Sequence, residues 1–169
     1  MTKPILAITM GDPAGVGPEI IAMSLAQEYP YTVCRPVVIG DAKMMEMGVK
    51  SAKVELQVRP IEQVAEAKYE RGVIDVLDLK LIDPATFAYG EVQAQCGHAA
   101  FEAVRTAIEL AMKGEVDGTV TAPLNKEALH VAGHNFAGHT EIYAHYTDTK
   151  KYAMLLADDK MRVIHVSTH

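Results

Sequence analysis

Short apolar runs alternate with helical patterns along most of the chain, and this alternation limits the possible folds more than any other feature. The runs are rich in β-branched residues and too short for helices, which is typical of buried strands. Strands are predicted at residues 4–10, 35–41, 54–60, 73–79 and 116–123. Helices are predicted at residues 18–29, 42–48, 91–113, 125–133 and 141–146. Strands that alternate with helices indicate an α/β fold whose first part has a parallel sheet.

Two of these helices carry specific predictions. Phe101, Val104, Ile108 and Met112 recur at helical spacing, so we expect them to share one apolar face of their helix. Gly48 is the last residue of the helix predicted at 42–48. We expect it to end that helix, because glycine is common just after a last helical turn.

Near the end of the chain, two more apolar runs flank the sequence Asp158-Asp159-Lys160. They predict strands at 152–157 and 162–169 joined by a tight turn, so this pair is expected to be antiparallel. The chain stops at His169, in the second predicted strand or directly after it, with no polar tail or closing helix. We therefore expect the 169 residues to be a fragment of a longer protein.

Charge and composition exclude several classes of partner. The formal net charge is −6 and there is no run of lysine and arginine, so binding to nucleic acid or to an anionic membrane surface is not expected. No stretch approaches the roughly 18 apolar residues of a membrane span. Cys34 and Cys96 are too far apart for a CxxC motif and are interpreted as reduced, partly buried thiols of a cytoplasmic protein. The negative net charge does not exclude a small anionic substrate, because such a substrate needs only local positive charge in its binding site.

A turn rich in glycine, GDPAGVG at residues 11–17, joins the first predicted strand to the first predicted helix. It does not match the phosphate-binding patterns, because Val16 and Ile20 stand where those patterns need glycine. Ligands nevertheless bind α/β folds where a strand ends and a helix begins. Asp12 is a possible polar contact on this turn, and the alternative is a connection that only needs flexible residues.

His139 and Thr140 follow Gly138 and offer an imidazole and a hydroxyl side by side. Both groups can hydrogen-bond to a phosphate or hydroxyl of a substrate, and the alternative is that one of them caps the following helix. Lys126 follows the predicted strand 116–123 and either pairs with an anionic group or is a solvated helix lysine.

Other conspicuous side chains are interpreted as structural. His130 and His134 are four residues apart, but Gly133 weakens a helix there, so both are expected to be structural or surface residues. A run of methionines is interpreted as filling the core rather than forming a binding surface; its members are Met44, Met45 and Met47.

Four blocks in order along the chain resemble the 4-hydroxythreonine-4-phosphate dehydrogenase family of pyridoxal phosphate biosynthesis. They are ITMGDPAGVGPEI at 8–20, TVTAPLNKEAL at 119–129, FAGHTEIYA at 136–144 and MRVIHVSTH at 161–169. The four blocks together identify the family specifically, although each block alone would be weak evidence for it.

The resemblance implies a three-layer α/β/α fold like that of isocitrate and isopropylmalate dehydrogenases. Enzymes of the family have two domains, a cleft between them, and a homodimer that completes each active site. Residues 1–124 would be the N-terminal part of the first domain, and residues 125–169 the beginning of the second. Because family members are much longer than this chain, we expect the chain alone to be inactive.

The resemblance also implies an activity: oxidation and decarboxylation of 4-phosphooxy-L-threonine to 3-amino-2-oxopropyl phosphate, with NAD or NADP. His139 and Thr140 would contact the substrate, and His169 would be one of three histidine ligands of a divalent metal such as zinc, magnesium, cobalt or manganese. Such a metal stabilises the alkoxide as hydride leaves and then polarises the new carbonyl. No role is carried over to Asp12 or Lys126.

Other functions stay open beside this one. A related enzyme acting on 4-phospho-D-threonate or 4-phosphoerythronate would show the same motifs. A non-catalytic module that binds a phosphorylated metabolite would need His139 and Thr140 but neither metal nor nicotinamide. A zinc hydrolase is disfavoured, since the chain has no HExxH arrangement.

Overall fold

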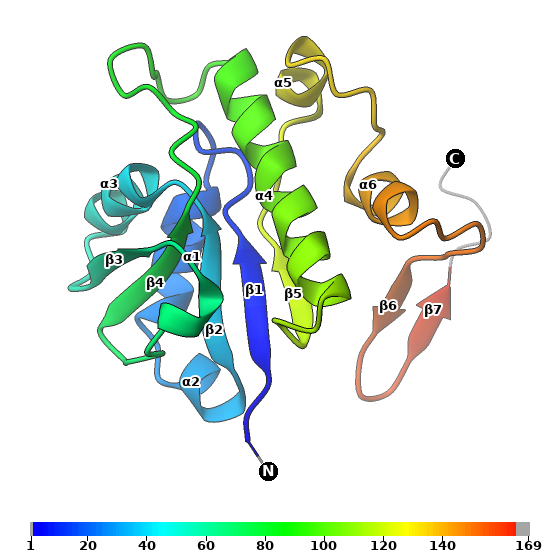
Figure 1. The fold of residues 1–169 in the computed structure, drawn as a ribbon, viewed down its shortest axis with the longest axis horizontal. Helices are drawn as coiled ribbons and strands as arrows, with labels where there is room; N and C mark the ends of the chain where they lie inside the picture. Colours follow the sequence, from blue (N-terminus) through cyan, green and yellow to red (C-terminus); the bar gives the residue numbers. More distant parts are fainter. Residues whose placement is uncertain (1, 165–169) are drawn as a thin grey trace.

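The computed structural model describes residues 2–164 and contains a five-stranded parallel sheet (Figure 1). The order of its strands is β3-β4-β2-β1-β5. The strands are β1 (Ile5–Thr9), β2 (Arg35–Gly40), β3 (Gln57–Ile61), β4 (Val73–Asp78) and β5 (Gly118–Thr121). The predicted α/β fold with a parallel sheet is therefore confirmed, with strands somewhat shorter than the apolar runs suggest.

Helices cover both faces of the sheet. They are α1 (Gly17–Leu25), α2 (Tyr29–Val33), α3 (Ala42–Ala52), α4 (Ala94–Met112), α5 (Lys126–Val131) and α6 (His139–Tyr146), with a 3-10 turn η1 (Val64–Glu66). Val38 of β2 packs in one apolar cluster with residues of α1 and α3, whereas Val37 and Ile39 pack in another with α4. Since successive strand residues point to opposite faces, the helices form two outer layers around the sheet (Figure 1).

A third apolar cluster joins α4 to the last two helices. Phe101, Val104 and Ile108 of α4 are buried together with Leu129 of α5 and Ile142 of α6. The shared face predicted for α4 is confirmed at these three positions. The prediction is wrong for Met112. This final residue of α4 lies one turn past the packed residues and is 66% exposed.

The prediction that Gly48 ends its helix is wrong, because α3 continues to Ala52. A Cβ on Gly48 would lie 2.6 Å from Cβ of Pro18 in α1, so the glycine serves the close approach of two helices. The helix ends instead before Lys53, whose φ of 54° is left-handed. A contact between two helices outweighs the local signal here.

The helix predicted at 18–29 is divided in the structure. The helix α1 ends at Leu25, and the short α2 begins at Tyr29 with Pro30 in its first turn. Proline lacks the N–H that a continuing helix would need but fits a first turn, which explains the division. The methionines behave as predicted, since Met44 and Met45 are buried in the core and the partly buried Met47 packs against it.

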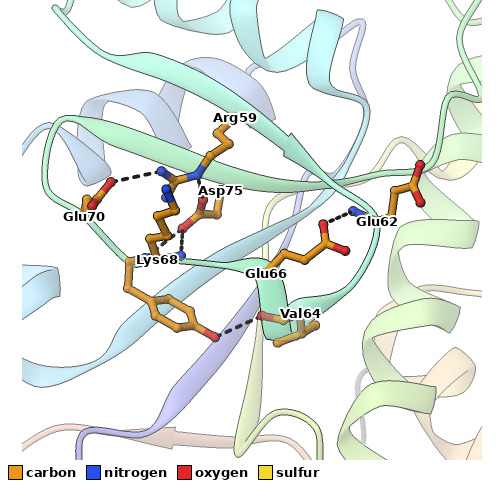
Figure 2. Close-up of polar contacts among 8 residues, drawn as sticks. Arg59, Glu62, Val64, Glu66, Lys68, Glu70 and Asp75 are labelled. Atoms are coloured by element: carbon orange, nitrogen blue, oxygen red, sulfur yellow. Dashed lines mark hydrogen bonds and ion pairs between the residues drawn. The ribbon is translucent and has the colours of Figure 1, made fainter.

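A buried carboxylate ties β3, β4 and the loop between them together (Figure 2). The side chain of Asp75 in β4 is 0% exposed. Its Oδ1 accepts from Nε of Arg59 at 2.6 Å, and its Oδ2 accepts from the amides of Lys68 and Tyr69 at 2.9 and 2.8 Å. Nη1 of Arg59 also contacts Glu70 at 2.9 Å. This network holds the β3 edge of the sheet.

Strands β6 (Leu155–Ala157) and β7 (Arg162–Ile164) form the predicted antiparallel hairpin, with Asp158 donating to the carbonyl of Met161 at 2.8 Å. The predicted continuation of β7 through His169 lies outside the described residues. In the part of the chain that the structure describes, no helix has the length and apolar character to cross a bilayer. The division into domains at residue 124 stays a prediction.

Candidate functional site

The loops after β1 and β5 meet at the carboxyl end of the sheet, because these two strands are parallel neighbours. The amide of Asp12 donates to the carbonyl of Pro123 at 2.9 Å. A Cβ on Gly11, whose φ is 71°, would lie 2.4 Å from that carbonyl oxygen, and one on Gly17 would lie 2.2 Å from the carbonyl oxygen of Met10. Close packing of the backbone therefore explains why glycine stands at both positions. This agrees with the alternative that the turn is only a connection between strand and helix.

Asp12 and Lys126 do not line the main cavity described below. Asp12 is 5% exposed, its Oδ1 accepts from the amide of Ala14 at 2.8 Å, and burial raises the pKa of its carboxyl group. Lys126 is an exposed first residue of α5, where Oδ1 of Asn125 caps the helix. The structure thus gives Asp12 a role in shaping the turn and leaves Lys126 on the surface.

A cavity of about 390 Å³ lies between β5, α6 and the segment that follows α6. Hydroxyl groups dominate its polar lining. The lining residues are Thr119, Thr121, His139, Thr140, Tyr143, Ala144, Thr147, Thr149, Tyr152, Ala153 and Met154. The two predicted substrate-binding residues are therefore brought together in one cavity, next to residues that the sequence reasoning did not select.

His139 begins α6 and carries a nitrogen without a partner. Its Nε2 is buried and makes no hydrogen bond within the described residues. Burial lowers the pKa of the imidazole, which favours the neutral ring. Gly138 is the residue before the helix and no side chain caps it, so the alternative that His139 or Thr140 caps α6 is wrong. An unpaired buried nitrogen is costly, and a polar ligand in the cavity would satisfy it.

Tyr143 and Thr119 join the two walls of the cavity. Oη of Tyr143 donates to Oγ1 of Thr119 at 2.7 Å, and burial raises the pKa of the Tyr143 hydroxyl. Sequence reasoning missed both residues. One signal was available for Tyr143, which lies four residues after His139 and therefore on the same side of a helix.

The described residues do not fit a metal site. No group of three or more histidine, cysteine, aspartate or glutamate side chains within residues 2–164 is arranged to hold a metal ion. His169, the predicted ligand, lies outside that range. His130 and His134 have structural contacts, as predicted: Nε2 of His130 lies 3.1 Å from the carbonyl oxygen of Phe136, and Nε2 of His134 lies 3.0 Å from Nδ1 of His98.

Comparisons with known proteins cover nearly the whole chain. The family model of "Pyridoxal phosphate biosynthetic protein PdxA" matches residues 32–169. A D-threonate 4-phosphate dehydrogenase of Salmonella typhimurium is 48% identical over 170 residues, which are 100% of this chain and 52% of the relative. The enzyme of the same name from Cupriavidus necator is 45% identical, over 98% of this chain and 50% of the relative. The chain thus spans about half the length of the curated relatives it matches.

Solved structures agree with this result. The crystal structure of a 4-hydroxythreonine-4-phosphate dehydrogenase from Burkholderia phymatum matches with a TM-score of 0.94 and 47% identity, over 100% of this chain and 51% of that one. A terephthalate 1,2-cis-dihydrodiol dehydrogenase from Burkholderia xenovorans matches with a TM-score of 0.74 and 26% identity, over 96% of this chain and 47% of that one. The predicted family resemblance and the predicted fold class are confirmed.

Proposed function

The chain belongs to the family of pyridoxal phosphate biosynthetic protein PdxA, and from this premise we propose that it is the N-terminal half of a dehydrogenase that oxidises a phosphorylated hydroxy acid with NAD or NADP. One observation carries the proposal to this chain: His139 and Thr140 line one cavity, together with further threonine and tyrosine side chains. The whole enzyme is proposed to be a cytoplasmic homodimer with shared active sites.

The proposed substrate is 4-phospho-D-threonate, because both curated relatives described above are named for it. The second candidate is 4-phosphooxy-L-threonine, which would give 3-amino-2-oxopropyl phosphate; the name of the Burkholderia phymatum structure favours it. Both are small phosphorylated acids with a secondary hydroxyl group to oxidise. The nicotinamide accepts the hydride in either case.

We propose that both halves of the enzyme contribute residues that bind the substrate. The neutral imidazole of His139 and the hydroxyl of Thr140 would bind and orient a hydroxyl or carboxylate oxygen. Neither lysine nor arginine is among the lining residues that the structure describes. Following the family resemblance, we propose that further residues beyond this sequence bind the phosphate. His169 is proposed as one ligand of a divalent metal, whose other ligands would also lie outside the described residues.

The first test is the intact mass of the natural protein, with bound divalent metal quantified on the same sample. A mass near that of the relatives, with metal bound, supports the proposal and is followed by assays of NAD and NADP reduction with both substrates. A mass of 18.4 kDa without metal or turnover would favour the alternative of a non-catalytic binding module. Residues 1–169 alone are expected to be inactive.

A mutation then ties the activity to the cavity. His139→Gln is expected to lower kcat/KM about tenfold or more, because a hydrogen bond to the substrate is lost or misdirected. His130→Gln is the matched control, since His130 is an exposed histidine that does not line the cavity. Equal activity of the two variants would argue against His139 as a substrate-binding residue.

A further inference from the structure

We propose that Tyr143 and Thr119 form a hydroxyl relay that donates one hydrogen bond to the substrate in the cavity beside His139, which makes them substrate-positioning residues. The inference rests on the proposed function, because it assigns further residues to the same site. It concerns the pair of hydroxyl groups that bridges α6 and β5.

The geometry places the relay next to His139. Tyr143 lies one helical turn after His139 in α6, so their side chains are on the same side of the helix. Thr119 lies in β5, and its Oγ1 is 2.7 Å from Oη of Tyr143. All three residues line the same cavity.

Counting hydrogens shows that the relay has one donor left over. Tyr143 gives its only hydroxyl hydrogen to Thr119. Thr119 thus accepts, and its own hydroxyl hydrogen has no acceptor among the hydrogen bonds of residues 2–164. Because Oγ1 of Thr119 is polarised by the hydrogen bond that it accepts, it becomes a better donor to a third group. The cavity is where that third group would lie.

Two side chains that can hydrogen-bond to a ligand line this cavity from two different elements. One is Thr119 on β5, whose hydroxyl hydrogen has no acceptor among the described residues, and the other is His139 on α6. A ligand with neighbouring oxygen atoms, such as a hydroxyl group next to a carboxylate, can satisfy both at once. The proposed substrate 4-phospho-D-threonate contains this arrangement, whereas 4-phosphooxy-L-threonine has an amino-bearing carbon between its hydroxyl-bearing carbon and its carboxylate.

The experiment removes each hydroxyl group without changing the shape around it. Thr119→Val and Tyr143→Phe are made in the full-length protein, and binding of 4-phospho-D-threonate and 4-phosphooxy-L-threonine is measured by calorimetry without nicotinamide. Each variant is expected to raise Kd about fivefold to tenfold, the effect of losing one hydrogen bond. The double variant should be no weaker than Thr119→Val alone, because both changes break the same relay.

Two controls separate positioning from folding. Thr119→Ser keeps the hydroxyl group and should bind nearly as tightly as the wild type. Tyr146→Phe changes a tyrosine of the same helix that packs near Phe101 and does not line the cavity, so Kd should not change. Thermal unfolding is followed for every variant. If Tyr143→Phe does not fold, the relay is tested by comparing the Kd values of Thr119→Val and Thr119→Ser.

Each outcome has a defined meaning. Equal Kd values for Thr119→Val and Thr119→Ser, or additive losses in the double variant, would overturn the relay. Binding without reduction of NAD or NADP would refute the proposed function, while weaker binding by Thr119→Val would still support the relay. If the wild type binds neither acid, the relay is refuted as well.

Discussion

Replacing Asp75 by asparagine tests how the β3 edge of the sheet is held. The change keeps the size of the side chain and removes its charge. The carboxylate of Asp75 accepts three hydrogen bonds, from Arg59 on one oxygen and from the amides of Lys68 and Tyr69 on the other (Figure 2). An asparagine has only one oxygen, so its NH2 group must face a donor whichever way the amide turns.

The magnitude follows from burial. Breaking a fully buried ion pair costs about 3–5 kcal/mol. Arg59 is 25% exposed and keeps Glu70 as a second partner, so part of its charge stays compensated. The expected loss is therefore about 2–4 kcal/mol in the free energy of unfolding. This is a large share of the roughly 5–15 kcal/mol that stabilises a typical domain.

Urea unfolding measures the effect. With a slope of about 2 kcal/mol per molar urea, the midpoint should fall by roughly 1–2 M for Asp75→Asn. Glu70→Gln is the matched control, because Glu70 is 57% exposed and its pair with Arg59 should contribute no more than about 1 kcal/mol. If Asp75→Asn lowers the midpoint no more than Glu70→Gln does, the buried carboxylate does not hold the β3 edge of the sheet.

Two further predictions concern a contact between helices and the titration of a histidine. Gly48→Ala should destabilise the protein by about 1–3 kcal/mol, measured as a lower Tm, because the new Cβ would overlap Pro18; an unchanged Tm would show that α1 and α3 can separate freely. Burial and the neighbouring His98 lower the pKa of His134, whereas Glu102 acts in the opposite direction. The unfolded state therefore binds more protons there, and stability should fall as the pH drops below about 6.5. Unfolding in urea across this range should show a smaller pH dependence for His134→Phe, and an equal one would refute the assignment.

The sequence predicts most strands and helices of this fold well because they follow from local patterns. The five strands of the sheet are short apolar runs, and the period of α4 is visible at Phe101, Val104 and Ile108. The end of α3 could not be predicted in the same way. Gly48 faces Pro18 of another helix, and no local pattern shows which helices will touch.

In the candidate site, too, the sequence predicts some residues and not others. His139 and Thr140 were found because they form part of a block that resembles a known family, and the structure places both in one cavity. Thr119 and Tyr143 are 24 residues apart, one on a strand and one on a helix. Their hydrogen bond depends on how α6 lies against β5, and sequence spacing carries no information about that contact.

The hairpin β6–β7 has a practical consequence for handling the isolated chain. Its six strand residues are all exposed, and they include Leu155, Leu156, Val163 and Ile164. A two-stranded hairpin is marginally stable by itself, and an uncovered apolar strand is a template for pairing with another molecule. We therefore expect this hairpin to limit the concentration at which residues 1–169 stay monomeric, and it is the first surface to protect with charged substitutions before crystallisation or NMR.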